Sequence, residues 1–89
     1  MEKSKLLVFY HLRSLISSLQ STCYHLASNY ATGNGVEMNA SKAVEWYMKA
    51  ADHGYAIAMN KLGLMYANGS GVEKDESKAA EWFKKATDH

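Results

Sequence analysis

A stretch of 28 residues occurs twice in this chain, 36 positions apart. Comparing residues 26–53 with residues 62–89 gives 16 identities in 28 aligned positions, without a gap. Ordinary residue usage would give on the order of two identities. A period of 20–50 residues is typical of repeat proteins, in which each unit packs against its neighbours. The sequence therefore predicts two stacked copies of one structural unit.

The second half of each unit has the pattern of an amphipathic helix. Apolar residues recur three and four positions apart, which places them on one face of a helix. They are Ala43, Trp46, Tyr47, Ala50 and Ala51 in the first copy, and Ala79, Trp82, Phe83 and Ala86 in the second. Asn39 and Asp75 stand where N-caps belong, because their side-chain oxygens can accept hydrogen bonds from free backbone N–H groups. Gly54 suits the end of the first of these helices.

The first half of each unit is also predicted to be helical. The same spacing links Met59, Leu62, Gly63 and Tyr66, whose counterparts are Cys23, Leu26, Ala27 and Tyr30. A glycine inside a helix costs roughly 1 kcal/mol relative to alanine. We therefore expect a neighbouring helix to approach closely at Gly63.

A glycine-rich segment joins the two helices of each unit. Residues 33–36 and 69–72 have two glycines one position apart, which permits positive φ angles. A phosphate-binding loop is the alternative, but its lysine and hydroxyl do not follow in register and no strand precedes it. The pattern favours a turn.

The composition fits one folded domain that does not bind nucleic acid. Ten basic and nine acidic residues are interleaved, and the net charge is +1, whereas a nucleic-acid surface needs a basic stripe. The single cysteine, Cys23, excludes an intrachain disulfide and fits a reducing compartment. No apolar run reaches the roughly 20 residues of a transmembrane helix. We expect a cytoplasmic protein without a membrane span.

The N-terminal segment has two interpretations. Two lysines followed by an apolar run are similar to an export signal, but His11 and Arg13 interrupt the run and no small-residue cleavage site follows. The other interpretation is an amphipathic helix. Residues 4–10 parallel residues 41–47 in Ser, Lys, an aromatic and Tyr, so we interpret residues 4–18 as the second helix of an eroded preceding unit. Export stays an open alternative.

The two units resemble the Sel-one-like repeat, a relative of the tetratricopeptide repeat. The stretch LGLMYANGSGVEKDESKAAEWFKKA has the family's leucine-glycine and tyrosine, its G-x-G-V turn and its K-A-x-x-W-[YF]-x-K-A helix. The first unit matches with Ala27 in place of glycine. The resemblance implies an all-α protein of about five helices, a right-handed α-α superhelix (solenoid) of two helix-turn-helix repeats plus an N-terminal helix. We assign residues 1–19 to a cap helix, 20–55 to repeat 1 and 56–89 to repeat 2.

The resemblance also implies a function. Such solenoids are non-enzymatic modules that act as adaptors or scaffolds and bind a protein or peptide. One secreted bacterial branch has two cysteines in each repeat, which this chain lacks. We expect no cofactor. A hydrolase is the alternative from another class, and no nucleophile motif supports it.

Several residues raise the question of catalysis or metal binding. Asp52-His53 and Asp88-His89 form a repeated pair, but sequence neighbours on a helix point apart, and a histidine at a helix C-terminus interacts favourably with the helix dipole. Cys23, His25 and His11 lack the spacing of a zinc site. We therefore expect no catalytic residue and no metal ligand.

The repeated tryptophans and lysines have structural interpretations. Trp46 and Trp82 recur in phase with the alanines, which favours the core. Lys42, Lys49, Lys78 and Lys85 are expected to be solvated helix flanks or salt-bridge partners.

A binding surface is expected where the two copies differ on exposed positions. Packing positions are fixed by the repeat, whereas recognition positions are free to change. In such solenoids the first helices line the concave face. The predicted protein-binding residues are Tyr24, His25, Ser28, Asn60, Lys61, Leu64 and Asn68. Neutral divergence of the surface is the alternative.

The C-terminal repeat has no polar helix after it in this sequence. Solenoid ends need polar caps, and roughly three repeats are usual for stability. We expect self-association through the uncapped C-terminal repeat, or that the chain is a structural fragment of a longer repeat array.

Overall fold

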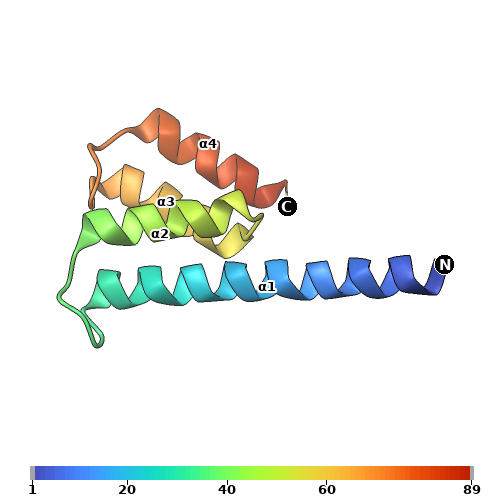
Figure 1. Ribbon diagram of the computed structural model, residues 1–89. Coiled ribbons are helices and arrows are strands. Elements are labelled where there is room, and N and C mark those ends of the chain that lie inside the picture. Colours follow the sequence, from blue (N-terminus) through green and yellow to red (C-terminus); the bar gives the residue numbers. More distant parts are fainter. Residues whose placement is uncertain (1, 89) are drawn as a thin grey trace.

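The computed structural model describes residues 2–88, with side chains at Val8 and from Leu12 onward, and this part of the chain forms four α-helices (Figure 1). They are α1 (Glu2–Thr32), α2 (Ala40–Asp52), α3 (Ala56–Asn68) and α4 (Glu76–Thr87). Each helix packs mainly against the helices next to it in sequence. The described residues contain no strand. The protein is therefore an all-α solenoid, as the sequence predicts.

The first helix differs from the prediction. We expected about five helices, with a separate cap helix over residues 1–19, but α1 is one continuous helix of 31 residues. The count of five is wrong for the described part of the chain. Residues 4–18 are likewise not a preceding repeat's second helix, since they run without a turn into the first helix of repeat 1. The reason is local: residues 14–22 contain no glycine or proline, so nothing ends the helix there.

The second helix of each repeat begins in the predicted way. The Asn39 side chain accepts a hydrogen bond from the Lys42 N–H at 3.1 Å, and Asp75 accepts one from Lys78 at 3.0 Å. The preceding turn closes back onto the first helix, because the Tyr30 carbonyl accepts the Asn39 N–H at 2.9 Å. The Tyr66 carbonyl and the Asp75 N–H repeat this bond at 2.9 Å. Both N-cap predictions are confirmed.

Two glycines are required by close contacts between elements. A β-carbon at Gly63 would lie 2.6 Å from the Phe83 ring, so α3 and α4 meet there as the sequence predicts. A β-carbon at Gly71 would lie 2.5 Å from the Ala40 carbonyl, at the start of α2. The turn of repeat 2 therefore packs directly against repeat 1.

The core lies between α1, α2 and α3. Its buried residues are Cys23, Ala27, Ala43, Val44, Tyr47, Ala50, Ala51, Ala58, Met59 and Leu62. Of α4 only Ala79 is buried. Trp46 and Trp82, which we expected in the core, are half-buried and pack against it from its edge.

Candidate functional site

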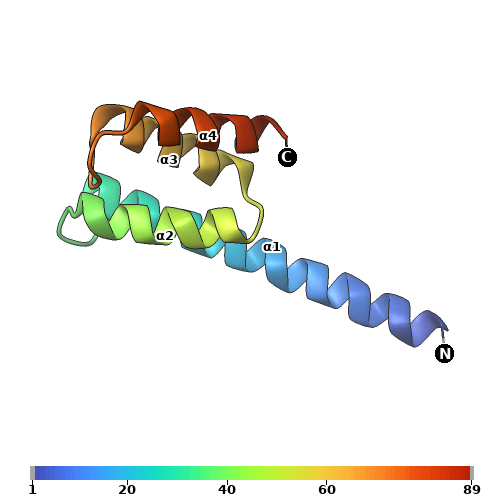
Figure 2. The same ribbon diagram turned by 90° about the horizontal axis from the view of Figure 1, so that it is seen from above.

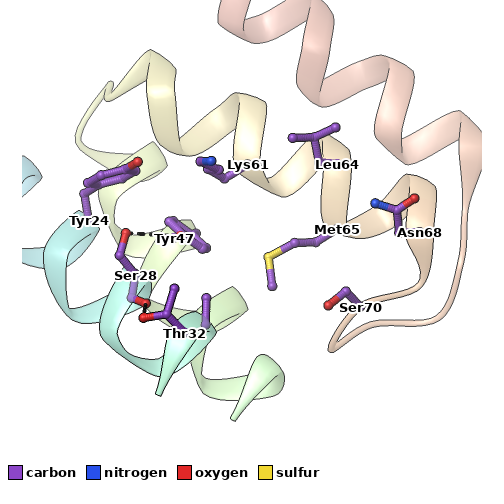
Figure 3. A pocket seen from close by; sticks show the side chains of 10 residues that line it. Tyr24, Ser28, Thr32, Tyr47, Lys61, Leu64, Met65, Asn68 and Ser70 are labelled. Carbon is purple, nitrogen blue, oxygen red and sulfur yellow. Dashed lines mark hydrogen bonds between the residues drawn. The ribbon is translucent and has the colours of Figure 1, made fainter. Parts of the chain in front are cut away.

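A hollow of about 310 Å³ lies between α1 and α3, the first helices of the two repeats (Figure 3). Four α1 residues, four α3 residues, one α2 residue and one residue of the second glycine turn form its lining. They are Tyr24, Ser28, Ala31, Thr32, Tyr47, Lys61, Leu64, Met65, Asn68 and Ser70. Because both repeats contribute, the hollow exists only when the repeats are stacked.

The hollow brings together five of the seven predicted binding residues. These are Tyr24, Ser28, Lys61, Leu64 and Asn68. The other two, His25 and Asn60, are exposed and do not line it. His25 lies beside Tyr24, with the ring centroids 6.0 Å apart in an edge-to-face arrangement. The comparison of the two copies thus finds two of the four α1 residues and three of the four α3 residues of the lining.

The lining combines an apolar wall with hydroxyl groups. Leu64 is 48% exposed and Met65 is half-buried, so α3 offers apolar contact area. On the α1 side the Ser28 Oγ lies 3.3 Å from the Tyr47 hydroxyl, and the Thr32 hydroxyl donates to the Ser28 carbonyl at 2.8 Å. An apolar surface beside a few placed polar groups is the usual composition of a binding site.

Lys61 gives the hollow its electrostatic character. It is exposed, and it is the one charged side chain among the lining residues. Asn68 adds an amide that can both donate and accept, which matches a peptide group. An acidic group and a free backbone edge would complement these two side chains.

The α1 wall of the hollow is held in place by aromatic packing. The Tyr24 ring centroid lies 5.7 Å from that of Tyr47 and 5.3 Å from that of Tyr55, both in tilted geometry. Aromatic pairs at such distances add to the stabilisation that burial gives. Tyr24 is consequently held by two other aromatic side chains of repeat 1, one on α2 and one just before α3.

The prediction missed Ala31, Thr32, Tyr47, Met65 and Ser70. Tyr47 was assigned to packing alone, and its ring is indeed only 4% exposed. Its hydroxyl nevertheless reaches Ser28 at the hollow. The signal was present in the sequence, since the second copy has Phe83 at this position and the two differ only by that hydroxyl.

The repeated lysines lie over aromatic rings. The Nζ atoms of Lys49 and Lys85 lie 4.1 and 4.6 Å from the ring centroids of Trp46 and Trp82. Lys42 and Lys78 lie 5.4 and 5.5 Å from the rings of Tyr30 and Tyr66. These lysines are exposed flanks, as expected, but carry cation–π contacts that the sequence analysis did not foresee.

Two further hollows lie at equivalent places beside the glycine turns. Tyr30, Val36, Glu37, Met38, Asn39 and Lys42 line one of about 420 Å³, and Tyr66, Val72, Glu73, Lys74, Asp75 and Lys78 line one of about 360 Å³. They recur because the turn recurs, which marks them as consequences of the repeat.

The residues that suggested catalysis or zinc have other surroundings. Asp52 and His53 are exposed at the end of α2, and the His53 carbonyl accepts a hydrogen bond from the Gln20 side chain. His89 lies outside the described residues, as does the side chain of His11. Cys23 is a buried free thiol. No group of three potential metal ligands occurs among the described side chains.

A membrane-spanning helix was not expected from the sequence. Among the described residues, no helix combines the length and the apolar character that crossing a membrane requires.

Comparison with known proteins shows the family. A family model of the Sel1 repeat matches residues 21–55 and 56–89, one unit after the other. The chain belongs to the Sel1 repeat family. Sel1 repeats are generally protein–protein interaction modules and non-enzymatic scaffolds. No curated protein matches the chain.

Solved structures share the fold. A Sel1 repeat protein from Oxalobacter formigenes is 39% identical over 78% of this chain and 28% of its own length, with a TM-score of 0.76. The protective antigen c5321 of uropathogenic Escherichia coli, which has an SLR fold, is 38% identical over 78% of this chain and 15% of its own, with a TM-score of 0.75. Helicobacter pylori cysteine rich protein B is 27% identical over 85% of this chain and 63% of its own, with a TM-score of 0.75. This Sel1 chain thus spans less than two thirds of each of these relatives.

Proposed function

We propose that this Sel1 chain is an adaptor module that binds an extended peptide segment of a partner protein in the hollow between α1 and α3. The observation that carries the proposal is the meeting of Tyr24, Ser28, Lys61, Leu64 and Asn68 around one hollow. Each of these five residues differs from its counterpart in the other repeat. The packing that the two repeats share therefore does not account for their identity.

The chemistry of the lining defines the partner segment. Lys61 attracts an acidic side chain, and Leu64 with Met65 receives an apolar one. Asn68 and the Ser70 hydroxyl, both exposed, are available to the segment's backbone. A short stretch with an acidic residue near an aliphatic residue fits these three features.

The test is a selection from a displayed peptide library on the full chain, followed by affinity measurement of the selected peptides. We expect enrichment of acidic residues. Lys61→Glu should weaken binding at least about tenfold, because it places a like charge against the ligand. Leu64→Ala should weaken it about fivefold or more through lost apolar contact.

His25→Ala and Asn60→Ala serve as matched controls. Both residues differ between the copies and are exposed, but neither lines the hollow. Affinities within about twofold of the unmodified chain are expected for them. Peptides that bind all four variants equally would refute the groove and leave neutral divergence as the account of these positions.

A second contact surface is favoured by α4. Ala80 and Phe83 are exposed, whereas Val44 and Tyr47, their counterparts in repeat 1, are buried. This face therefore has the composition of a helix-packing surface. Self-association through it stays a prediction, and Ala80→Gln, which makes the face polar without lowering helix propensity much, is the variant that tests it.

A further inference from the structure

The N-terminal half of α1 carries an apolar stripe that no other described element covers. Five large aliphatic side chains within twelve residues are each between 45% and 58% exposed. They are Val8, Leu12, Leu15, Ile16 and Leu19. In both views this half of α1 projects beyond the other three helices (Figures 1 and 2). A continuous stripe of this kind marks an interaction surface, unlike single exposed apolar residues.

The stripe continues a face that is already a packing face farther along α1. From the buried Cys23 toward the N-terminus, Leu19, Ile16 and Leu12 follow at intervals of four, three and four. This alternation is the spacing with which two helices pack along their length.

The end of α2 divides this face into a covered and an open part. α2 ends at Asp52, and the next carbonyl, that of His53, accepts a hydrogen bond from the Gln20 side chain. The face is therefore covered from about Gln20 onward and open before it.

The residues that flank the stripe on α1 indicate what kind of partner covers it. Ser14, Ser17 and Ser18 are exposed on this half of α1, and Arg13 is the one charged residue between residues 8 and 22. A helix that lies on a membrane carries a strongly charged polar face, and a helix that selects a different partner helix carries rows of complementary charges. This segment has neither, but an aliphatic stripe with an uncharged border is complementary to another copy of itself.

We propose that the stripe is a self-association surface, on which two copies of this chain pair through the N-terminal halves of α1 in antiparallel orientation. The antiparallel orientation follows from the position of α2, because a parallel pair would bring the α2 helices of both copies to the same end of the contact, where each already covers its own α1. In the antiparallel pair each stripe covers the other about a two-fold axis, as in an isologous interface. The repeats then lie at opposite ends of the dimer.

The size of the contact sets its strength. Residues 8–19 span about 18 Å at the rise of an α-helix. An interface of this length falls at the small end of specific contacts, so dissociation constants no tighter than about micromolar are expected. The hollow between α1 and α3 lies in the repeats and stays open in each copy.

The test is sedimentation equilibrium of the full chain from micromolar to near-millimolar concentration. We expect a reversible monomer–dimer equilibrium. Leu12→Gln with Ile16→Gln should raise the dissociation constant at least about tenfold, because these side chains lie at the centre of the stripe. Both positions are exposed, so unchanged helicity by circular dichroism is expected. Ala80→Gln separates this contact from the predicted association through α4, because a dimer held by the α1 stripe should persist in that variant.

Orientation is tested with spin labels. With Cys23 replaced by Ala, a label at Ser77→Cys on α4 should give intermolecular distances beyond 51 Å, the longest extent of one chain. Shorter distances would overturn the antiparallel arrangement. A chain that is monomeric throughout, a dimer lost with Ala80→Gln but kept with the α1 variant, or a monomer that binds vesicles of phosphatidylserine and phosphatidylcholine through α1 would each overturn the proposal.

Discussion

At the scale of single residues, the two repeats differ where helices approach most closely. Gly63 of α3 faces the Phe83 ring of α4, and a β-carbon there would lie within 2.9 Å of three ring atoms. In repeat 1 the same pair is Ala27 and Tyr47, both buried. Repeat 1 therefore has an extra methyl group and an extra hydroxyl at these two positions, and the hydroxyl lies 3.3 Å from the Ser28 Oγ.

We predict that Gly63→Ala lowers the free energy of unfolding by about 1 kcal/mol. Overpacking against the Phe83 ring costs about 1–3 kcal/mol, and the gain in helix propensity of about 1 kcal/mol offsets part of it. Urea unfolding followed by circular dichroism measures the change. In the Phe83→Leu background the ring is absent, so adding Gly63→Ala should make the protein more stable than Phe83→Leu alone. A stability increase for the single variant would show that the ring moves aside without cost.

At the scale of helices, α2 and α4 each begin at a capping side chain, whereas Tyr55 before α3 makes no such hydrogen bond. The caps of α2 and α4 have the same backbone angles, φ −151° and ψ 100°, although one is Asn39 and the other Asp75. α4 also has Glu76 in its first turn and Lys84 and Lys85 in its last, which complements the helix dipole. This support matters because α4 is packed on one side only.

We predict that Asp75→Ala lowers the free energy of unfolding by about 1 kcal/mol, the usual cost of a lost N-cap. Ser77→Ala, two residues farther along and exposed, is the control and should leave stability unchanged or slightly raised. Thermal unfolding of the two variants gives the comparison. Equal melting temperatures would contradict a capping role for Asp75.

The sequence predicted those elements that local signals define. Asn39, Asp75 and the glycine turns fixed the second helices, and the spacing around Leu62 fixed α3. α1 was wrongly divided, because a helix boundary was assumed in a segment with no residue that ends a helix. Lys61 and Leu64 were found at the hollow because they differ between copies, but Tyr47 was missed since its ring is core and only its hydroxyl reaches the site. Hydrophobic periodicity assigns a whole side chain to the core or to the surface, so it cannot predict that the ring is buried while the hydroxyl reaches the hollow.

At the scale of the whole molecule, stability depends on how the second glycine turn meets α2. Gly71 lies against the Ala40 backbone, and the Ser41 hydroxyl donates to the Gly71 carbonyl at 3.4 Å. The equivalent Gly35 has almost the same backbone angle, φ 78° against 74°, but nothing lies within 4 Å of its added β-carbon. Comparing substitutions at the two glycines therefore distinguishes the cost of the backbone conformation, which both share, from the cost of disturbing the contact between repeats, which only Gly71 makes.

We predict that Gly71→Ala destabilises the protein by at least about 1 kcal/mol more than Gly35→Ala. Both variants bear the cost of positive φ, about 1–2 kcal/mol, but only Gly71→Ala also forces the repeats apart. Equilibrium unfolding in urea provides both values. Similar losses for the two variants would mean that the contact at Ala40 adds nothing to the stacking of the repeats.

Chemical-shift mapping with a selected peptide shows directly whether the hollow between α1 and α3 is the binding site. We expect shifts in the amide signals of Tyr24, Ser28, Lys61, Leu64 and Asn68, with little change at Trp46 and Trp82. Shifts confined to α4, or to residues 8–19, would contradict it and place the partner on another surface.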